Sequence, residues 1–277
     1  MIEACLYVVA TPIGNLDDIS LRALKVLAGV AVIAAEDTRR TRALLSRHGL
    51  NRPMVALQEH NEEQQAPGLI ERMTQGDSVA LVSDAGTPLL SDPGYRLVNL
   101  AVSAGIEVVA VPGASSITAA LSICGLPTDR FVFEGFLPSR QAGRLKRLSE
   151  LLTEKRTVVC FESSHRIRES LADVEEVFGE DRPVAVCREM TKQFETVIRG
   201  SVSQVRQEVE RNADQRRGEF VLVLAGSEKD EQDGFAGALK LARALQSHLS
   251  ASQAARVAAK LHDVSRRDLY RALESGD

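Results

Sequence analysis

The sequence predicts an α/β protein with a mostly parallel sheet in its first half, a second α/β half and a small helical unit near its C-terminal end. Short apolar runs alternate with helical segments along the first half, which is typical of βαβ units. Three of these runs, ending at Ala10, Val82 and Val111, lead into turns rich in Pro and Gly. Parallel sheets bind ligands outside the carboxyl ends of their strands, so the three turns predict one shared pocket.

The elements follow from periodicity and from capping residues. In the first half we expect strands at 6–10, 30–35, 54–57, 79–82 and 107–111, and helices at 20–28, 38–48, 61–74, 95–104 and 117–124. In the second half we expect strands at 131–136, 157–162, 184–189, 195–199 and 219–225, and helices at 140–154, 167–177 and 202–211. A hinge at 124–129 and a charged tract at 227–234 divide the chain into domains 1–124, 125–228 and 235–277.

The last unit has its own pattern. Helices are expected at 239–249, 250–261 and 269–274, with the last one opened by 265–268. The last two, joined by a tight turn, resemble a helix-turn-helix with Arg266, Arg267 and Arg271 on its second helix. A small helical cap on the protein is an equal alternative.

Composition narrows the function classes. The chain has 277 residues, is 44% hydrophobic and carries a net charge of −4, which argues against indiscriminate polyanion binding. Its four cysteines are far apart and form no Cys/His cluster, so we expect buried thiols, no metal site and a reducing, cytoplasmic location. We find no signal peptide and no apolar run of membrane-spanning length.

The common phosphate and nucleophile motifs are missing. The sequence contains no GxGxxG after a strand, no GxxxxGK[ST] and no GxSxG. The predicted pocket instead offers backbone turns, Asp84 and the small hydroxyl residues Ser115 and Ser116. Such a pocket suits a ligand with many polar groups, positive charge and little phosphate.

Charged residues follow four of the predicted strands, at 36–39, 59–62, 162–166 and 188–192. Each set has a structural explanation as a helix cap or a surface ion pair. Four such sets of charged residues, all at the edge of a sheet where ligands bind, favour a functional site.

Seven motifs together resemble the tetrapyrrole methylase superfamily and, within it, the RsmI-type ribosomal RNA 2′-O-methyltransferases. They are TPIGNL (11–16), AEDTR (35–39), SDAGTP (83–88), DPG (92–94), VPG (111–113), EGF (134–136) and ESSHR (162–166). The resemblance covers residues 6–225 and extends to the C-terminal helices. It implies two α/β domains with a cofactor cleft between them, S-adenosyl-L-methionine as cofactor, a homodimer, and methylation of a decoding-site cytidine in 16S ribosomal RNA or the assembled small subunit.

By position, the resemblance also implies which residues line the cofactor pocket. These are Ile13, Gly14, Asp84, Ala85, Gly86, Thr87, Ser115, Ser116, Phe161, Met190 and Glu219. Asp84 is expected to hold the ribose or the amino-acid portion, the 115–116 turn to contact the methionine end, and Phe161 and Met190 to pack on the adenine.

Methyl transfer to a ribose hydroxyl calls for a base that takes the hydroxyl proton. The candidates, in order, are Glu36 or Asp37, then His60, then Glu189, with Glu134 and Glu162 also available. For RNA binding we expect Arg39, Arg40, Arg140, Arg144, Arg147, Arg266 and Arg267, although basic runs are also common on solvated helix faces. Two alternatives stay open at this point: a methyltransferase for a corrin or porphyrin precursor, and a non-catalytic helix-turn-helix regulator.

Overall fold

The computed structural model describes residues 4–227, 231–262 and 264–275. Its contacts divide the chain into two compact units. One contains the chain through Ser149 together with Thr157–Ala225, and the other contains Glu150–Arg156 and the chain from Gly226 onward. The predicted division at 124 and 228 remains a prediction, because both sheets belong to the first unit.

The first sheet is wholly parallel, in the order β3-β2-β4-β1-β5. Its strands are β1 (Leu6–Val9), β2 (Val32–Ala35), β3 (Met54–Ala56), β4 (Val79–Val82) and β5 (Val108–Val111). The helices between them are α1 (Leu21–Gly29), α2 (Thr38–Arg47), α3 (Glu62–Thr74) and α4 (Tyr95–Ser103), and a short 3-10 turn, η1 (Leu16–Asp18), precedes α1. The mostly parallel sheet predicted from the alternating pattern is confirmed.

Helices cover both faces of this sheet, so its strands are apolar on both sides. Ile33 and Ala35 of β2 pack with residues of α1 and α2, whereas Val32 and Ala34 pack with residues of α3 and α4. The residue before α1 stabilises the start of that helix. Ser20 caps α1 by accepting a hydrogen bond from the Ala23 N–H.

The second sheet is mixed, in the order β6-β7-β10-β8-β9. Its strands are β6 (Phe131–Phe136), β7 (Thr157–Ser163), β8 (Pro183–Arg188), β9 (Thr196–Ser201) and β10 (Glu219–Leu224). Only β6 and β7 pair in parallel, and β10 and β9 run antiparallel to their neighbours. Its helices are α6 (Gln141–Glu150), α7 (Ile167–Phe178) and α8 (Val202–Arg211), followed by the 3-10 turn η2 (Ala213–Arg216).

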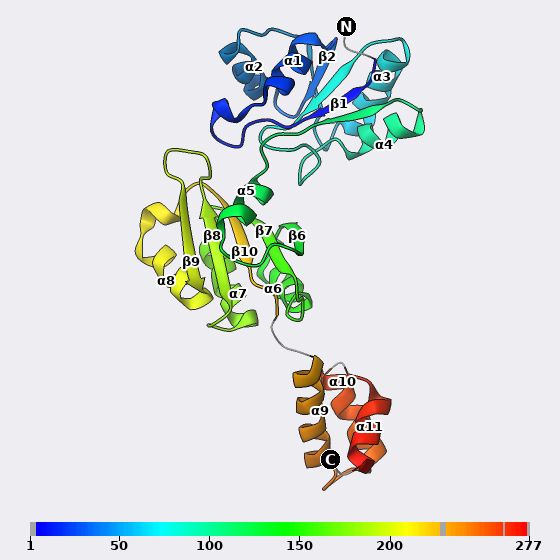
Figure 1. Cartoon of the computed structure of the whole chain (residues 1–277), viewed down its shortest axis with the longest axis vertical. Helices are drawn as coiled ribbons and strands as arrows, with labels where there is room; N and C mark the ends of the chain where they lie inside the picture. Colours follow the sequence, from blue (N-terminus) through cyan, green and yellow to red (C-terminus); the bar gives the residue numbers. More distant parts are fainter. Residues whose placement is uncertain (1–3, 228–230, 263, 276–277) are drawn as a thin grey trace. The chain divides into compact units, whose positions relative to one another are not determined.

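Helix α5 (Ser116–Ile123) joins the two sheets. It follows the last strand of the first sheet, yet Ile117, Ala120 and Leu121 pack on strands of the second sheet. Figure 1 shows α5 beside β7, β8 and β10. The first sheet and the second are thereby connected through buried apolar side chains as well as through the chain itself.

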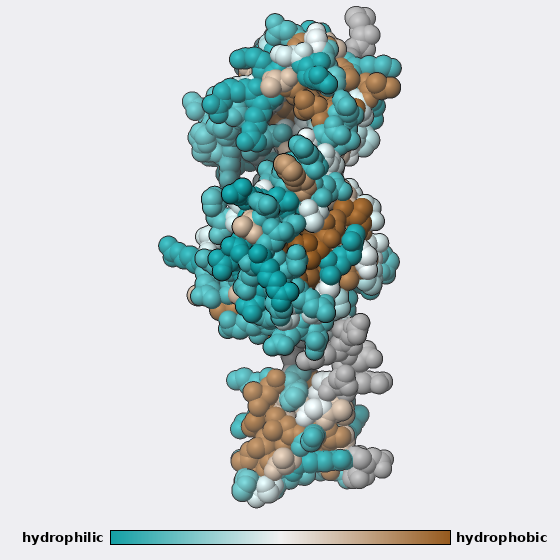
Figure 2. Space-filling view, turned by 90° about the vertical axis from the view of Figure 1, so that its left-hand side faces the viewer, coloured by the Kyte–Doolittle hydropathy of each residue, from teal (hydrophilic) through white to brown (hydrophobic). Residues whose placement is uncertain are grey.

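The helical unit consists of α9 (Glu231–Leu245), α10 (Ala251–His262) and α11 (Arg266–Ser275). Helix α9 begins eight residues earlier than the predicted 239–249, so the second half of the expected charged tract, residues 231–234, is helical. The core of the unit is rich in alanine, which lets the helices approach closely: Ala238, Ala242, Ala255, Ala258, Ala259 and Leu269 are buried together. Leu261 is 70% exposed, and Figure 2 shows an apolar area on the visible face of this unit.

Two properties of the described residues bear on the class of function. No helix among them is long and apolar enough to cross a membrane. The same residues contain no group of three or more His, Cys, Asp or Glu arranged to hold a metal ion. The four cysteines are buried, and burial raises the pKa of Cys187 to about 12, so its thiol is unreactive at neutral pH.

Arg144, predicted to bind RNA, is instead a structural residue. Its side chain is 1% exposed, and its Nε lies 2.6 Å from Oδ2 of Asp173, which is 2% exposed. Gln141 donates to the other oxygen of Asp173 at 2.9 Å. The periodicity of the basic helix did not reveal that this arginine points into the protein, toward an acidic residue on α7.

We predict that Arg144→Ala lowers the free energy of unfolding by about 3–5 kcal/mol, because it leaves the buried Asp173 carboxylate without its cation. Urea denaturation followed by circular dichroism measures this change. The matched control is Arg140→Ala, at an exposed position near the same helix, which we expect to stay within about 0.5 kcal/mol of the parent. Equal stabilities of the two variants would contradict the assignment.

Candidate functional site

Hydrogen bonds join the three Pro/Gly turns at the carboxyl edge of the first sheet. The Thr11 N–H donates to the Gly86 carbonyl at 2.8 Å, and the Gly86 N–H donates to the Thr11 carbonyl at 3.0 Å. The Thr87 hydroxyl donates to the carbonyl of Ala114 in the turn after β5, at 3.2 Å. The turns therefore form one continuous wall, as the sequence predicted.

The second sheet brings three more segments to a common edge. Strand β10 runs antiparallel to both β7 and β8, so its first residues lie beside the last residues of those two strands. Glu219 pairs with Ser163, and Phe220 pairs with both Glu162 and Arg188. Sequence periodicity cannot show this arrangement, because it depends on strand direction.

A cavity of about 480 Å³ lies between these two edges. Its volume is within the range of small-molecule sites, roughly 300–1,000 Å³. From the first sheet and α5 it is lined by Ile13, Glu36, Arg40, Asp84, Ala85, Gly86, Thr87, Leu90, Ser91, Asp92, Ser115, Ser116 and Ile117. From the second sheet it is lined by Phe136, Phe161, Glu162, Ser163, Ser164, Met190, Lys192, Gly218, Glu219, Phe220 and Val221.

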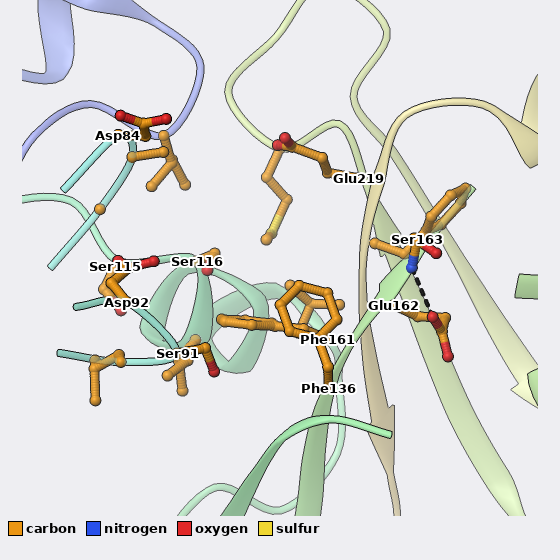
Figure 3. A pocket seen from close by; sticks show the side chains of 18 of the residues that line it. Asp84, Ser91, Asp92, Ser115, Ser116, Phe136, Phe161, Glu162, Ser163 and Glu219 are labelled. Atoms are coloured by element: carbon orange, nitrogen blue, oxygen red, sulfur yellow. Dashed lines mark hydrogen bonds between the residues drawn. The ribbon is translucent and has the colours of Figure 1, made fainter. Parts of the chain in front are cut away.

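The cavity has an acidic side and an aromatic side. Figure 3 shows Asp84 and Asp92 opposite the rings of Phe136 and Phe161. The ring centroids of Phe136 and Phe161 are 5.5 Å apart in an edge-on arrangement, and Phe136 is 55% exposed. Only 4% of the chain is aromatic, so the three phenylalanines that line this cavity, with Phe220 as the third, are a marked local enrichment.

Backbone N–H groups and one arginine hold most of the acidic side in place. The Glu36 carboxylate accepts from the Asp84 N–H at 3.1 Å, and the Asp84 carboxylate accepts from the Asp37 N–H at 2.9 Å. Arg40 Nη1 lies 3.3 Å from the second oxygen of Asp84. The ends of β2 and β4 are thus linked by their own acidic side chains.

Asp92 differs from its acidic neighbours. Burial and then the nearby negative charge of Glu36 raise its pKa to about 6, although a hydrogen bond from the Ser83 hydroxyl acts in the opposite direction. Ser91, the residue before it, has φ of 71°, an uncommon conformation for a residue with a side chain. The loop therefore holds Asp92 at the cavity against both backbone strain and charge repulsion.

The structure places the residues predicted as bases in different surroundings. Glu36 lines the cavity, but Asp37, His60 and Glu189 are absent from the described residues that line it. Asp37 caps α2, and the hydrogen bond from Arg39 holds the pKa of its carboxyl well below the ordinary value. His60 is exposed in the turn after β3. The geometry thus disfavours Asp37 and His60 as the base.

Glu189 is likewise committed to a structural contact. Burial acts to raise its pKa, but the hydrogen bond from Lys192 Nζ, at 2.8 Å, and one from the Glu219 N–H outweigh burial and lower it. A carboxylate stabilised in its charged form is a weak base.

The two remaining candidates are also bound to cations. Arg147 pairs with Glu134 at 2.6 Å, and Arg166 pairs with Glu162 at 2.8 Å. The Glu162 carboxylate also accepts from Ser170 and from the Ser163 N–H, and Figure 3 shows it directed away from the cavity. Neither side chain is free to accept a proton from a substrate.

Ten of the eleven residues expected to bind the cofactor line this cavity. The exception is Gly14, which lines a neighbouring open groove with Thr191 and Lys192. A Cβ atom on Gly14 would lie 2.5 Å from Cγ of Lys192 and 3.0 Å from the Met190 carbonyl oxygen. Gly14 is therefore required for close approach of the two domain edges rather than for lining the cavity.

The remaining basic residues expected at RNA have different surroundings. Arg40 lines the cavity and its side chain is 68% exposed, and that of Arg39 is 87% exposed. Arg147 is engaged by Glu134, as described above. Arg140 is exposed, as are Arg266 and Arg267 at the start of α11. Arg266 also donates to the Ser252 hydroxyl.

Comparisons with known proteins agree with this architecture. Residues 5–206 match the family of Tetrapyrrole (Corrin/Porphyrin) Methylases, and residues 232–276 match the RsmI C-terminal HTH domain. The chain is 47% identical to Ribosomal RNA small subunit methyltransferase I of Xylella fastidiosa, over 96% of this chain and 97% of that protein. It is also 47% identical to the protein of that name from Escherichia coli O157:H7, over 97% and 94% of the two chains.

The chain belongs to the Ribosomal RNA small subunit methyltransferase I family. It is therefore an enzyme, a methyltransferase that uses S-adenosylmethionine, and the alternative of a non-catalytic regulator is wrong. The match to an HTH domain confirms the prediction of a helix-turn-helix-like extension.

Solved structures show the same fold at low sequence identity. The methyltransferase CobJ aligns with a TM-score of 0.59 at 17% identity, covering 80% of this chain and 94% of that one. A uroporphyrin-III C-methyltransferase from Thermus thermophilus, solved with S-adenyl homocysteine, aligns with a TM-score of 0.55 at 18% identity, covering 80% and 97%. The predicted tetrapyrrole methylase-like fold is confirmed.

The cavity of this family member fits S-adenosylmethionine. Acidic side chains suit a cationic donor with ribose hydroxyls, and the phenylalanines offer an apolar wall for a purine ring. The first N–H groups of α5 suit a carboxylate, because Ser115 makes no capping hydrogen bond with its side chain.

Sequence reasoning missed several lining residues. Asp92 was visible in the DPG motif and Phe136 in the EGF motif, so residue type and position after a strand could have identified both. Gly218 and Phe220 carry no such signal, because they precede or begin a strand. Two residues of the four charged sets have structural roles: Glu62 caps the start of α4 by accepting from the Leu97 N–H, and Arg188 donates to backbone carbonyls.

We predict that Asp92→Asn stabilises the fold at pH 8 by about 1–2 kcal/mol and has little effect at pH 4. The folded-state pKa of Asp92, about 6, lies above its unfolded value. Ionisation therefore destabilises the folded state progressively as the pH rises from 4 through 6, and the neutral amide avoids this penalty. Thermal unfolding at both pH values tests the prediction, and a destabilised variant at pH 8 would contradict it.

Proposed function

We propose that this methyltransferase transfers the methyl group of S-adenosylmethionine to small-subunit ribosomal RNA, at the ribose 2′-hydroxyl of a cytidine in the decoding region. The proposal of a ribosomal RNA substrate rests on the comparison with Ribosomal RNA small subunit methyltransferase I, to which the chain is 47% identical over nearly its full length. The resemblance of the seven motifs to RsmI-type enzymes supports the cytidine and the 2′-hydroxyl.

In this proposal, the cofactor lies across the cavity between the two sheets. Asp84 holds the ribose or amino group, and the start of α5 at Ser115 and Ser116 receives the carboxylate. Phe161 and Met190 pack on the adenine. When bound, the cofactor supplies a methyl group activated by a sulfonium.

The chain's own residues then have three tasks. The loops after β1 and β4 fix the position of the donor, and the apolar wall excludes water from it. A side chain near the acceptor oxygen takes its proton. Alignment of two reactants in a dry site accounts for much of the acceleration of such a displacement.

For RNA, we propose that phosphate contacts at the cavity mouth position the target nucleotide. Arg39 and Arg40 lie at the start of α2 next to the acidic side, and Arg140, Arg266 and Arg267 offer further exposed charges. Arg144 is withdrawn from this set because it is buried. The homodimer also remains a prediction, to be tested by light scattering of the purified protein.

We predict that Asp84→Ala weakens S-adenosylmethionine binding by about 10- to 100-fold. The replacement removes a charged acceptor, an interaction worth about 1.5–3 kcal/mol. Isothermal titration calorimetry measures the change. Asp77→Ala, which removes a half-exposed carboxylate paired with Arg72, is the matched control and should bind like the parent. Parent-like binding by Asp84→Ala would contradict the placement.

We predict that Arg39→Ala weakens binding of the small subunit and reduces the slope of log affinity against log salt by about 0.7–0.9, as expected for the loss of one phosphate contact. Cofactor affinity should not change. Arg22→Ala, at an exposed position on α1, is the control. Filter binding at several salt concentrations measures the slope. Identical slopes for Arg39→Ala and the parent would show that the RNA phosphates do not contact Arg39.

The proposed function is tested by incubating small subunits from a strain that lacks this protein with the purified enzyme and labelled cofactor. Nuclease digestion and mass spectrometry of the 16S ribosomal RNA should locate one new 2′-O-methylcytidine. Methylation at another atom or nucleotide would refute the finer assignment. Transfer to a porphyrin precursor but not to RNA would refute the proposal as a whole.

A further inference from the structure

We propose that Asp92 is the catalytic base that accepts the proton from the substrate hydroxyl. This inference rests on the proposed function, because it concerns the acceptor of the same methyl transfer. It is built from the contacts of every carboxylate that lines the cavity.

Five acidic residues line the cavity among the described residues, namely Glu36, Asp84, Asp92, Glu162 and Glu219, and the carboxylate of Glu162 is turned away from it. Four of them already accept from a cation or a backbone N–H. Glu36 accepts from the Asp84 N–H, and Asp84 accepts from the Asp37 N–H and pairs with Arg40. Glu162 pairs with Arg166, and Glu219 pairs with Lys192 at 3.0 Å. The protein's own donors and cations therefore already engage these four carboxylates.

Asp92 has a different set of neighbours. No lysine or arginine in the described part of the chain forms an ion pair with it, and its one side-chain partner is the Ser83 hydroxyl. The charged groups around it are Glu36 at the end of β2 and Asp84 at the end of β4, with Arg40 of α2 paired to Asp84. The lining residues from α5 and β6, which are Ser116, Ile117 and Phe136, bring no titratable side chain.

This environment raises the pKa of Asp92 to about 6. A base works best when its pKa lies close to the operating pH, because it is then both ionised and able to hold a proton. At neutral pH the Asp92 carboxyl is mostly ionised and can still hold a proton.

The backbone fixes Asp92 at the cavity. Leu89 and Ser91 adopt positive φ values of 75° and 71°, and such strain is often stored at functional sites. A Cβ on Gly135, in the irregular part of β6, would lie 3.1 Å from the Ser91 hydroxyl oxygen, so the second sheet closes against this loop. Figure 3 shows Asp92 and Ser91 facing the same space as Phe136.

The proton and electron balance is simple. The hydroxyl oxygen forms a bond to the methyl carbon while the carbon–sulfur bond breaks and leaves its electron pair on sulfur. The O–H bond breaks as well, and its proton goes to the Asp92 carboxylate. Asp92 later releases this proton to water at the partly exposed cavity mouth.

The test compares the parent with Asp92→Asn and Asp92→Glu in single-turnover methylation of unmethylated small subunits, with both substrates saturating, from pH 5 to 8.5. For the parent we expect a rate that falls about tenfold per pH unit below pH 6 and is constant above it. Asp92→Asn should lower the rate by about 10²- to 10⁴-fold and abolish the acidic limb. Asp92→Glu should recover part of the rate, and Asp77→Asn should match the parent.

Calorimetry separates catalysis from binding. Asp92→Asn should bind S-adenosylmethionine within threefold of the parent, and its stability at pH 8 verifies that it folds. A rate within threefold of the parent, a surviving acidic limb, or a rate loss equal to the loss of cofactor affinity would each overturn the inference. If the parent itself methylates no RNA, the proposed function fails and this inference fails with it, whereas a failure confined to the variants leaves the proposed function intact.

Discussion

The two-way backbone bridge between Thr11 and Gly86 is the constraint on which the rest of the site depends. It joins the loops after β1 and β4, the two central strands of the first sheet, at the edge where the cavity opens. Gly86 has φ of +85°, and a Cβ there would approach Ile13 to 3.3 Å, so any other residue strains this contact. Asp84, Thr87 and Ile13 take their positions from the bridge.

A second constraint is electrostatic. The ends of β2 and β4 bring acidic side chains together, and like charges at short range oppose each other's ionisation. Backbone N–H groups and Arg40 relieve this repulsion at Glu36 and Asp84, but the relief does not extend to Asp92. One cluster thus contains two carboxylates engaged by backbone N–H groups and Arg40, together with Asp92, whose pKa is raised by burial and by negative neighbours. Such different surroundings allow one site to contain both a carboxylate that binds the cofactor and a carboxylate that accepts a proton.

The fold itself leaves the substrate open. Methyltransferases related to this chain at 17–19% identity share its two-sheet architecture, and a shared fold does not determine function. In this chain the two sheets are followed by a helical unit that matches the RsmI C-terminal HTH domain.

The sequence by itself determined the elements, their order and the three turns of the first sheet, because periodicity, caps and glycines are local properties of the chain. The family resemblance also implied, by position, that Asp84, Ser115 and Phe161 belong to one site. Only the tertiary structure decided that Arg144 is buried against Asp173, that Glu162 is bound by Arg166 and turned away, and that Asp92 lies at the cavity with no ion-pair partner among the described residues. The reason is physical: the burial, pairing and pKa of a charged side chain depend on residues distant in sequence, which the antiparallel strands and the crossing helices bring beside it.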